Sequence, residues 1–285
     1  MLEYFSFRLE LAFSIQNLAE EEGQLHIYEA VLSHFLELMR LSHNDNQGVR
    51  TLTPFLLLDM KRDEDCYNFI KWWWAVGPAD VCDCGEESTR NSQEGDWLWM
   101  KGQDRHEDIF QVVPKLKNKS IEFGHLVALT MLKLRLVAEY KARLCELNTL
   151  EEVLEGFSYH SLLQAEPAMD CIRKHHSSFS AEAILKQQEA HLENYLDRID
   201  LANPVFLKAV INPEPLMSQN MTSVSKGSPD EAHEILGLCG RTLTQLPGAY
   251  ERIASRVGHE PQYQVTMSTL DPSKVHKLDI VEFRV

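Results

Sequence analysis

The side chains that could perform chemistry are twelve histidines, six cysteines and many carboxylates, and their spacing decides whether any of them form a site. Cys82 and Cys84 are the only close cysteine pair, and His106 is the nearest histidine partner we consider for them. Two cysteines one residue apart strain a shared tetrahedral zinc site, and no second pair completes the ligand set. We therefore predict no metal site.

The known catalytic motifs are absent from the sequence. It contains no Gly-x-Ser-x-Gly nucleophile turn, no Gly-rich phosphate loop ending in Gly-Lys and no Gly-x-Gly-x-x-Gly dinucleotide motif. The acids at 63–65 lie where carboxylates favour the start of a helix. We predict no cofactor and no enzyme activity. The alternative is an unfamiliar enzyme with a histidine and carboxylate site in a helical core, using His125 or His160 as acid or base.

Four residues are our candidates for contact with a partner: Arg50, Trp74, Trp97 and Trp99. Arg50 lies one turn into a predicted helix, where it can either pair with Asp45 or line a groove. Residues 72–74 are three successive tryptophans, which point about 100° apart on a helix and so cannot all face one way. One or two of them must be core, and the third either covers a neighbour or remains exposed. An exposed tryptophan favours a protein interface.

The chain has 285 residues, of which 44% are hydrophobic, and a formal net charge of −15. This excess of acid opposes binding to nucleic acid or to an anionic membrane. No stretch is apolar for long enough to span a bilayer, and the first residues lack the order of a signal peptide. We expect an intracellular protein, cytoplasmic or nuclear, whose partner is another protein.

The N-terminal region, 1–76, predicts four helices with short connections, which is typical of antiparallel helix pairs. Two of these helices cover Tyr4–Glu22 and Ile27–Leu41, and two more lie between positions 43 and 76. Asn44, Asp45 and Asn46 are possible caps. Pro54 either bends the third helix or begins it.

A repeat is one explanation for these helices. Phe35 and Phe69 lie one tetratricopeptide period apart in the sequence, and so do Leu38 and Trp72. The same apolar periodicity also suits an irregular bundle. The fold class is therefore all-α, either a tetratricopeptide-like array or an irregular bundle.

The rest of the chain divides by composition. Residues 77–119 form a long acidic insert with many glycines, and residues 258–285 form a tail with two strand-like stretches. Between them, residues 120–257 predict a C-terminal helical region on the same core, whose central helix covers Ile121–Leu147. Further helices are predicted in this region at Leu150–Phe157, Leu162–His175, Ser180–Asp200, from Ser228 to about Leu243, and from Pro247 to about Val257.

Several short islands resemble a group of uncharacterised fungal helical proteins, some of which also carry a MYND-type zinc finger. The islands are residues 45–50 with Pro54, 65–73, 126–136, 211–213, 227–232 and 247–249. The resemblance implies a shared all-helical fold and supplies no activity. This chain lacks the cysteine and histidine spacing of the finger. Our first hypothesis is therefore a helical scaffold that binds another protein, through a groove between helix pairs or through the acidic insert.

Overall fold

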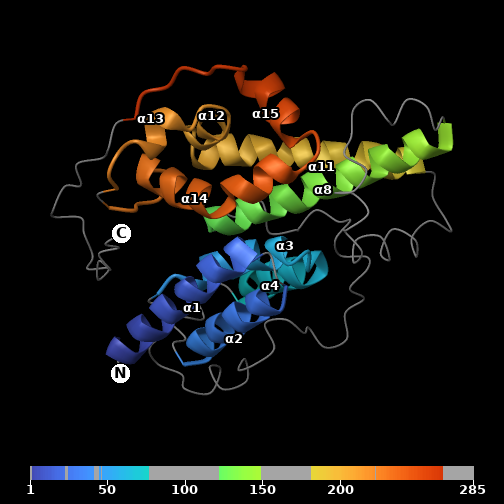
Figure 1. Cartoon of the computed structure of the whole chain (residues 1–285). Helices are drawn as coiled ribbons and strands as arrows, with labels where there is room; N and C mark the ends of the chain where they lie inside the picture. Colours follow the sequence, from blue (N-terminus) through green and yellow to red (C-terminus); the bar gives the residue numbers. More distant parts are fainter. Residues whose placement is uncertain are drawn as a thin grey trace. The chain divides into compact units, whose positions relative to one another are not determined.

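The structure of the chain is a computed structural model, and it describes residues 2–22, 25–41, 45, 47–76, 122–148, 181–221 and 223–265. Within these ranges the chain forms ten helices and no strand, which confirms the all-α prediction (Figure 1). The insert at 77–119, the predicted helices at 150–157 and 162–175, and residues 266–285 of the tail lie outside the described residues. The predicted domain boundaries stay a prediction.

The chain divides into two compact units, residues 1–193 and 194–285. The first unit begins with α1 (Leu2–Glu22), α2 (Leu25–Leu41), α3 (Val49–Asp59) and α4 (Asp63–Val76). Successive helices pack against one another along this series, α1 on α2, α2 on α3 and α3 on α4. Only residues 23 and 24 separate α1 from α2, so α2 runs back along α1. Whether these pairs form a repeat stays a prediction.

The start of α3 is fixed by a carboxylate that lies three residues before the Gly48 cap. Asp45 accepts hydrogen bonds from the backbone N–H groups of Val49 (2.8 Å) and Arg50 (2.9 Å). These are donors that a helix leaves unpaired in its first turn. The alternative in which α3 begins at Pro54 is wrong, because Pro54 lies inside the helix.

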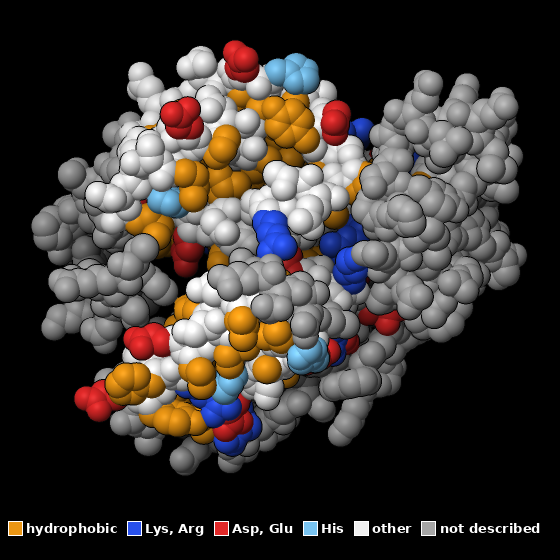
Figure 2. All heavy atoms as spheres, in the orientation of Figure 1, with side chains coloured by type: hydrophobic (Ala, Val, Ile, Leu, Met, Phe, Trp, Pro, Cys, Tyr) orange, Lys and Arg blue, Asp and Glu red, His pale blue; other side chains and the backbone are white. Residues whose placement is uncertain are grey.

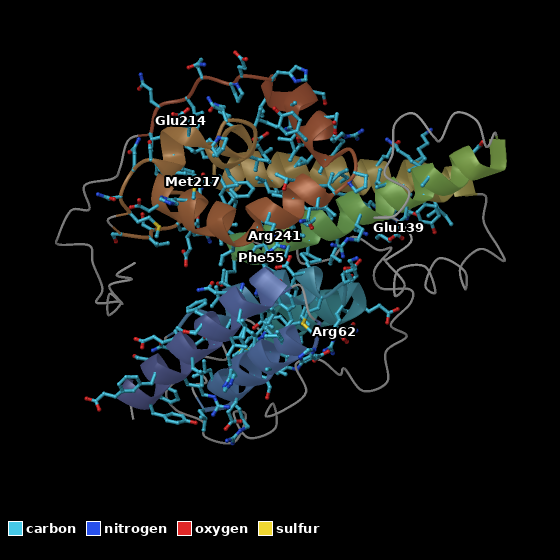
Figure 3. The ribbon with its side chains drawn as sticks, viewed as in Figure 1. Phe55, Arg62, Glu139, Glu214, Met217 and Arg241 are labelled. Carbon is cyan, nitrogen blue, oxygen red and sulfur yellow. The ribbon has the colours of Figure 1, made fainter. Side chains whose placement is uncertain are left out.

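The turn between α3 and α4 is held by Arg62. Its guanidinium bonds Asp65 at 2.7 Å and Glu29 of α2 at 3.2 Å, so one side chain ties α4 to α2 (Figure 3). Three acids occupy the first turn of α4, where they meet the positive end of the helix dipole.

α8 (Phe123–Asn148) packs on both α3 and α4. Almost every described side chain between Phe123 and Tyr140 is buried, as expected for a helix that is apolar on most faces. Arg135 of α8 pairs with the buried Asp63 at the start of α4. The first half of α11 (Ala181–Ala202) joins α8 through Lys141 and Glu189, 2.8 Å apart.

The second unit contains the end of α11 and four more helices: α12 (Phe206–Ile211), α13 (Glu214–Met217), α14 (Pro229–Gln245) and α15 (Ala249–Val257). α12 packs on both α14 and α15. Residues 203–217 contain prolines at 204, 213 and 215, and the structure nevertheless forms two short helices in this stretch, α12 and α13. Pro213 and Pro215 are tolerated because they lie at the N-terminal end of α13, where no helical N–H partner is required.

α14 begins after an N-cap serine, Ser228, the residue from which the sequence predicted this helix. Ser228 Oγ accepts from the backbone N–H of Glu231 at 3.1 Å, and Glu231 Oε2 accepts from Gly227 N at 2.7 Å. This is the reciprocal pattern of a capping box, shifted by one residue. The fully buried Asn203 donates to the carbonyl of Ser228 at 2.9 Å and so ties the end of α11 to the start of α14.

Candidate functional site

A cluster of polar and aromatic side chains joins α3, α4 and α8. The Arg50 cluster consists of Asp45, Arg50, Thr51, Trp73, Glu122 and His125. The Arg50 guanidinium carbon lies 4.3 Å from the centre of the Trp73 ring, a cation–π contact, and its Nε is 3.5 Å from Asp45 Oδ2. The pairing with Asp45 that the sequence suggested is therefore present. The Arg50 side chain is 21% exposed, and its role in partner contact stays a prediction.

The Arg50 cluster replaces a backbone hydrogen bond that Pro54 removes from α3. A proline in a helix has no N–H, so the carbonyl of the residue four positions earlier, here Arg50, loses its helical donor. His125 of α8 supplies the missing donor, with its Nε2 lying 3.1 Å from the Arg50 carbonyl oxygen. The His125 ring also packs edge-on against Phe69 of α4, with centroids 6.3 Å apart. One histidine therefore connects three helices.

The pKa values of the two carboxylates in the cluster shift in opposite directions, although burial acts to raise both. Burial raises the pKa of Asp45 to about 6, although the Arg50 charge and the two backbone N–H donors act against it. Burial also acts to raise the pKa of Glu122, but the His125 charge, the Thr51 hydroxyl and Arg50 together hold this pKa below its usual value. The Thr51 hydroxyl of α3 donates a hydrogen bond to the carboxylate of Glu122, which directly precedes α8, and so links the two helices.

The contacts of His125 with the Arg50 carbonyl and the Phe69 ring give this histidine a structural role. The residue is 1% exposed, and its Nε2 is occupied by the Arg50 carbonyl. A general acid or base must reach the proton that it transfers. His160, the other histidine of the enzyme alternative, lies outside the described residues. In the part of the chain that is described, no group of three or more His, Cys, Asp or Glu residues could hold a metal ion.

A second buried polar contact lies between α8 and the first half of α11. Lys133 is 1% exposed, and its Nζ donates to Gln188 Oε1 at 2.8 Å. Burial lowers the pKa of Lys133 to about 7. Burial, with a contribution from the Lys133 charge, also lowers the pKa of His191 to about 4. A lysine of low pKa can act as a nucleophile, but this amine is enclosed and its visible role is to join the two helices.

The surface feature that stands out in the first unit is a row of exposed apolar side chains on α1. The α1 stripe consists of Tyr4, Phe7, Leu11 and Leu18, whose exposed fractions are 50%, 67%, 49% and 48%. At 100° per residue these positions fall within a sector of about 60° on the helix. Figure 2 shows hydrophobic side chains at the surface over α1 and α2, with acidic side chains beside them.

The stripe was not found from the sequence. Leu18 shares the helical spacing of the apolar residues Phe5, Leu9, Ala12 and Ala19, yet the structure shows it half exposed. These four residues form the buried face of α1. Because α1 is apolar on two faces, periodicity alone marks no boundary between them. The sequence does contain one pattern that indicates the stripe, which is the heptad spacing of residues 4, 11 and 18 with residue 7 between them.

The remaining predicted contact residues are not placed by the structure. The side chain of Trp74 and the whole of Trp97 and Trp99 lie outside the described residues, as do Cys82, Cys84 and His106. Of the tryptophan triplet, Trp73 is 9% exposed and packs edge-on against Trp72 at 4.7 Å between centroids. Trp73 is thus a core residue, as the triplet argument requires of at least one of the three.

No protein family matches the sequence, and neither a curated protein nor a solved structure is similar to the chain. Among the described residues, no helix is both long enough and apolar enough to cross a membrane.

Proposed function

We propose that this chain is a helical scaffold that binds another protein, and that the α1 stripe is part of the contact surface. The observation that carries the proposal is the exposure of four large apolar side chains on one face of one helix. Single exposed apolar residues are common on proteins, whereas a contiguous apolar patch is often functional.

The rest of the first unit supports a binding role. The Arg50 cluster and the Asp63–Arg135 pair hold α3, α4 and α8 together through buried polar contacts. α1 packs on α2, which in turn packs on α3 of this framework. A helix held in place in this way has less freedom to lose on binding, which lowers the cost of ordering. We also propose that the chain shares its scaffold fold with the fungal helical proteins that it resembles.

The acidic insert is the second route by which the scaffold can contact a partner. Residues 77–119 contain Trp97 and Trp99, and Trp74 and Arg50 precede them in the sequence. Aromatic and arginine side chains dominate the energy of many interfaces. Deletion of residues 77–119 therefore belongs in the same experiment as the stripe variants.

The test is quantitative affinity capture of the tagged chain from its native cells, followed by mass spectrometry. The double variant Phe7→Glu/Leu11→Glu is expected to lose the partner that the unaltered chain captures, because charge in the stripe opposes apolar contact. Leu201→Glu is the matched control, since Leu201 is 87% exposed and lies on a different helix. Circular dichroism and thermal unfolding confirm that each variant is folded.

Equal capture by the stripe variant and by the unaltered chain would remove the stripe from the proposal. If the insert deletion alone then lost the partner, the contact would lie in residues 77–119. If neither change altered capture, the scaffold proposal itself would fail.

A further inference from the structure

The α1 stripe is bordered on one side by acid. Glu3 and Glu10 are exposed, and at 100° per residue both fall on the same flank of the stripe, followed two turns later by the exposed Asn17. Among the described residues, no ion pair holds either carboxylate. An apolar row with free carboxylates along one edge favours a partner that brings positive charge to that edge.

The opposite flank carries one basic side chain, Arg8, which is already engaged. Its Nη1 donates to the hydroxyl of Tyr4 at 2.5 Å, and its guanidinium lies 5.9 Å from the centre of the Tyr4 ring. Burial, and then the Arg8 charge, lower the pKa of His34 on α2. Arg8 keeps its positive charge, but it lies on the flank opposite Glu3 and Glu10, and among the described residues it forms no ion pair with either of them.

The pair of helices α1 and α2 is acidic as a whole. Residues 2–41 contain seven Asp or Glu against two Lys or Arg. The second basic residue, Arg40, is bound by both carboxylate oxygens of Glu37 at 2.7 Å. The field around the stripe is thus negative, in keeping with the net charge of −15 for the chain.

From this arrangement we infer that the occupant of the α1 stripe is a basic amphipathic helix of another protein. Its apolar residues, spaced three and four apart, pack on Phe7, Leu11 and Leu18, and its Lys or Arg residues lie along Glu3 and Glu10. Two helices meet in this way when each offers a narrow apolar seam with charges beside it. The inference rests on the proposed function and names the chemistry of the partner.

A second copy of this chain fits the surface less well. Two stripes packed in antiparallel fashion bring the acidic flanks together, and a parallel pair offers only the engaged Arg8 to the opposing Glu3. The exposed parts of the four stripe residues amount to on the order of 400 Å², about half of what each partner buries in a standard interface. An anionic bilayer meets the same repulsion as a second copy.

The experiment uses two synthetic helical peptides, each about five turns long, as probes of the full-length chain. Both carry the same leucine row at positions spaced three and four apart, and they differ only in having lysine or glutamate along the flanks. Binding is measured by fluorescence anisotropy at low and high salt. We expect the lysine peptide to bind at least about fivefold more tightly, with the preference reduced by salt.

The decisive variant is Glu3→Lys/Glu10→Lys, which is expected to reverse the preference in favour of the glutamate peptide. Its control is Glu214→Lys/Glu260→Lys, which makes the same change in net charge at two exposed acids of the second unit. This control should leave the preference nearly unchanged. The variant Phe7→Glu/Leu11→Glu should bind neither peptide.

Three results would overturn the inference. One is a preference for the lysine peptide that survives Glu3→Lys/Glu10→Lys. Another is failure of both peptides to bind while Phe7→Glu/Leu11→Glu still loses the native partner, a result that keeps the proposed function and rejects a basic helix. The third is self-association in sedimentation velocity that Phe7→Glu/Leu11→Glu abolishes, which would assign the stripe to a second copy.

Discussion

His125 Nε2 lies 3.1 Å from the carbonyl oxygen of Arg50, the oxygen that Pro54 leaves without its helical donor. The two residues are 75 positions apart, so a local defect in α3 is repaired by a helix from a distant part of the sequence. The proline and the histidine therefore form one structural unit, and their substitutions should not act independently.

The first prediction is a double-mutant cycle at this contact. His125→Phe keeps a ring against Phe69 but leaves the Arg50 carbonyl unpaired, which should lower the free energy of unfolding by about 1–3 kcal/mol. In a Pro54→Ala background the restored N–H of residue 54 can bond the same carbonyl, so the loss should be smaller by about 1 kcal/mol. Urea unfolding of the four proteins measures the coupling, and equal losses in both backgrounds would contradict the repair.

The second prediction concerns pH and Asp45, whose pKa rises from 3.8 to about 6 on burial. Between these two values the folded chain holds a proton that the unfolded chain has released, so stability falls as pH rises through this window. Asp45→Asn removes the titration. Relative to Asp45→Asn, the unaltered protein should lose up to about 1.4 kcal/mol per pH unit from about pH 4 to 6 and little beyond. Urea unfolding at each pH measures the difference, and parallel profiles would refute the effect.

Local signals in the sequence were sufficient to predict that most of the described helices exist and where some of them begin. Ser228 followed by Pro229 and two acids predicts the start of α14 because every group involved lies within four residues. Asp45 was named as a possible cap for the same reason. The pairing of Arg50 with Asp45 also spans only five residues, and the structure contains it.

Contacts that depend on packing could not be predicted in this way. Nothing near His125 in the sequence indicates that its ring reaches α3, and nothing near Lys133 indicates Gln188, which is 55 residues away. The exposure of Leu18 could not be predicted either, because α1 has two apolar faces and only the position of α2 distinguishes them. A pattern along one helix specifies which residues share a face, and its neighbours decide which face is buried.

The third prediction concerns the buried ion pair between Asp63 and Arg135, whose side chains are 3% and 11% exposed. Arg135→Met leaves a buried carboxylate without its partner and should cost about 3–5 kcal/mol of stability. The double variant Asp63→Asn/Arg135→Met removes the charge as well and should cost less than Arg135→Met alone. Denaturant midpoints decide the order, and a double variant less stable than the single would show that Asp63 is not the source of the loss.

The fourth prediction concerns Lys133, whose pKa falls from 10.5 to about 7 on burial. Above pH 7 the unfolded chain holds a proton that the folded chain has released, so this residue makes stability rise with pH up to about 10. Lys133→Met abolishes that rise, which amounts to at most about 1.4 kcal/mol per pH unit. Unfolding experiments between pH 7 and pH 10 compare the two proteins, and equal slopes would show that the amine is not buried as described.

The fifth prediction compares two glycines of the second unit that have similar backbone angles. Gly227 has φ +75° and Gly248 has φ +71°, so alanine is strained at both positions and should cost about 1–2 kcal/mol at each. A side chain on Gly248 meets nothing within 4 Å, whereas one on Gly227 lies 3.1 Å from the backbone oxygen of Ala202. Gly227→Ala should therefore be the more destabilising change, because the end of α11 must move to admit the methyl group. Thermal unfolding of the two variants measures the difference, and equal losses would mean that the contact with Ala202 yields without cost.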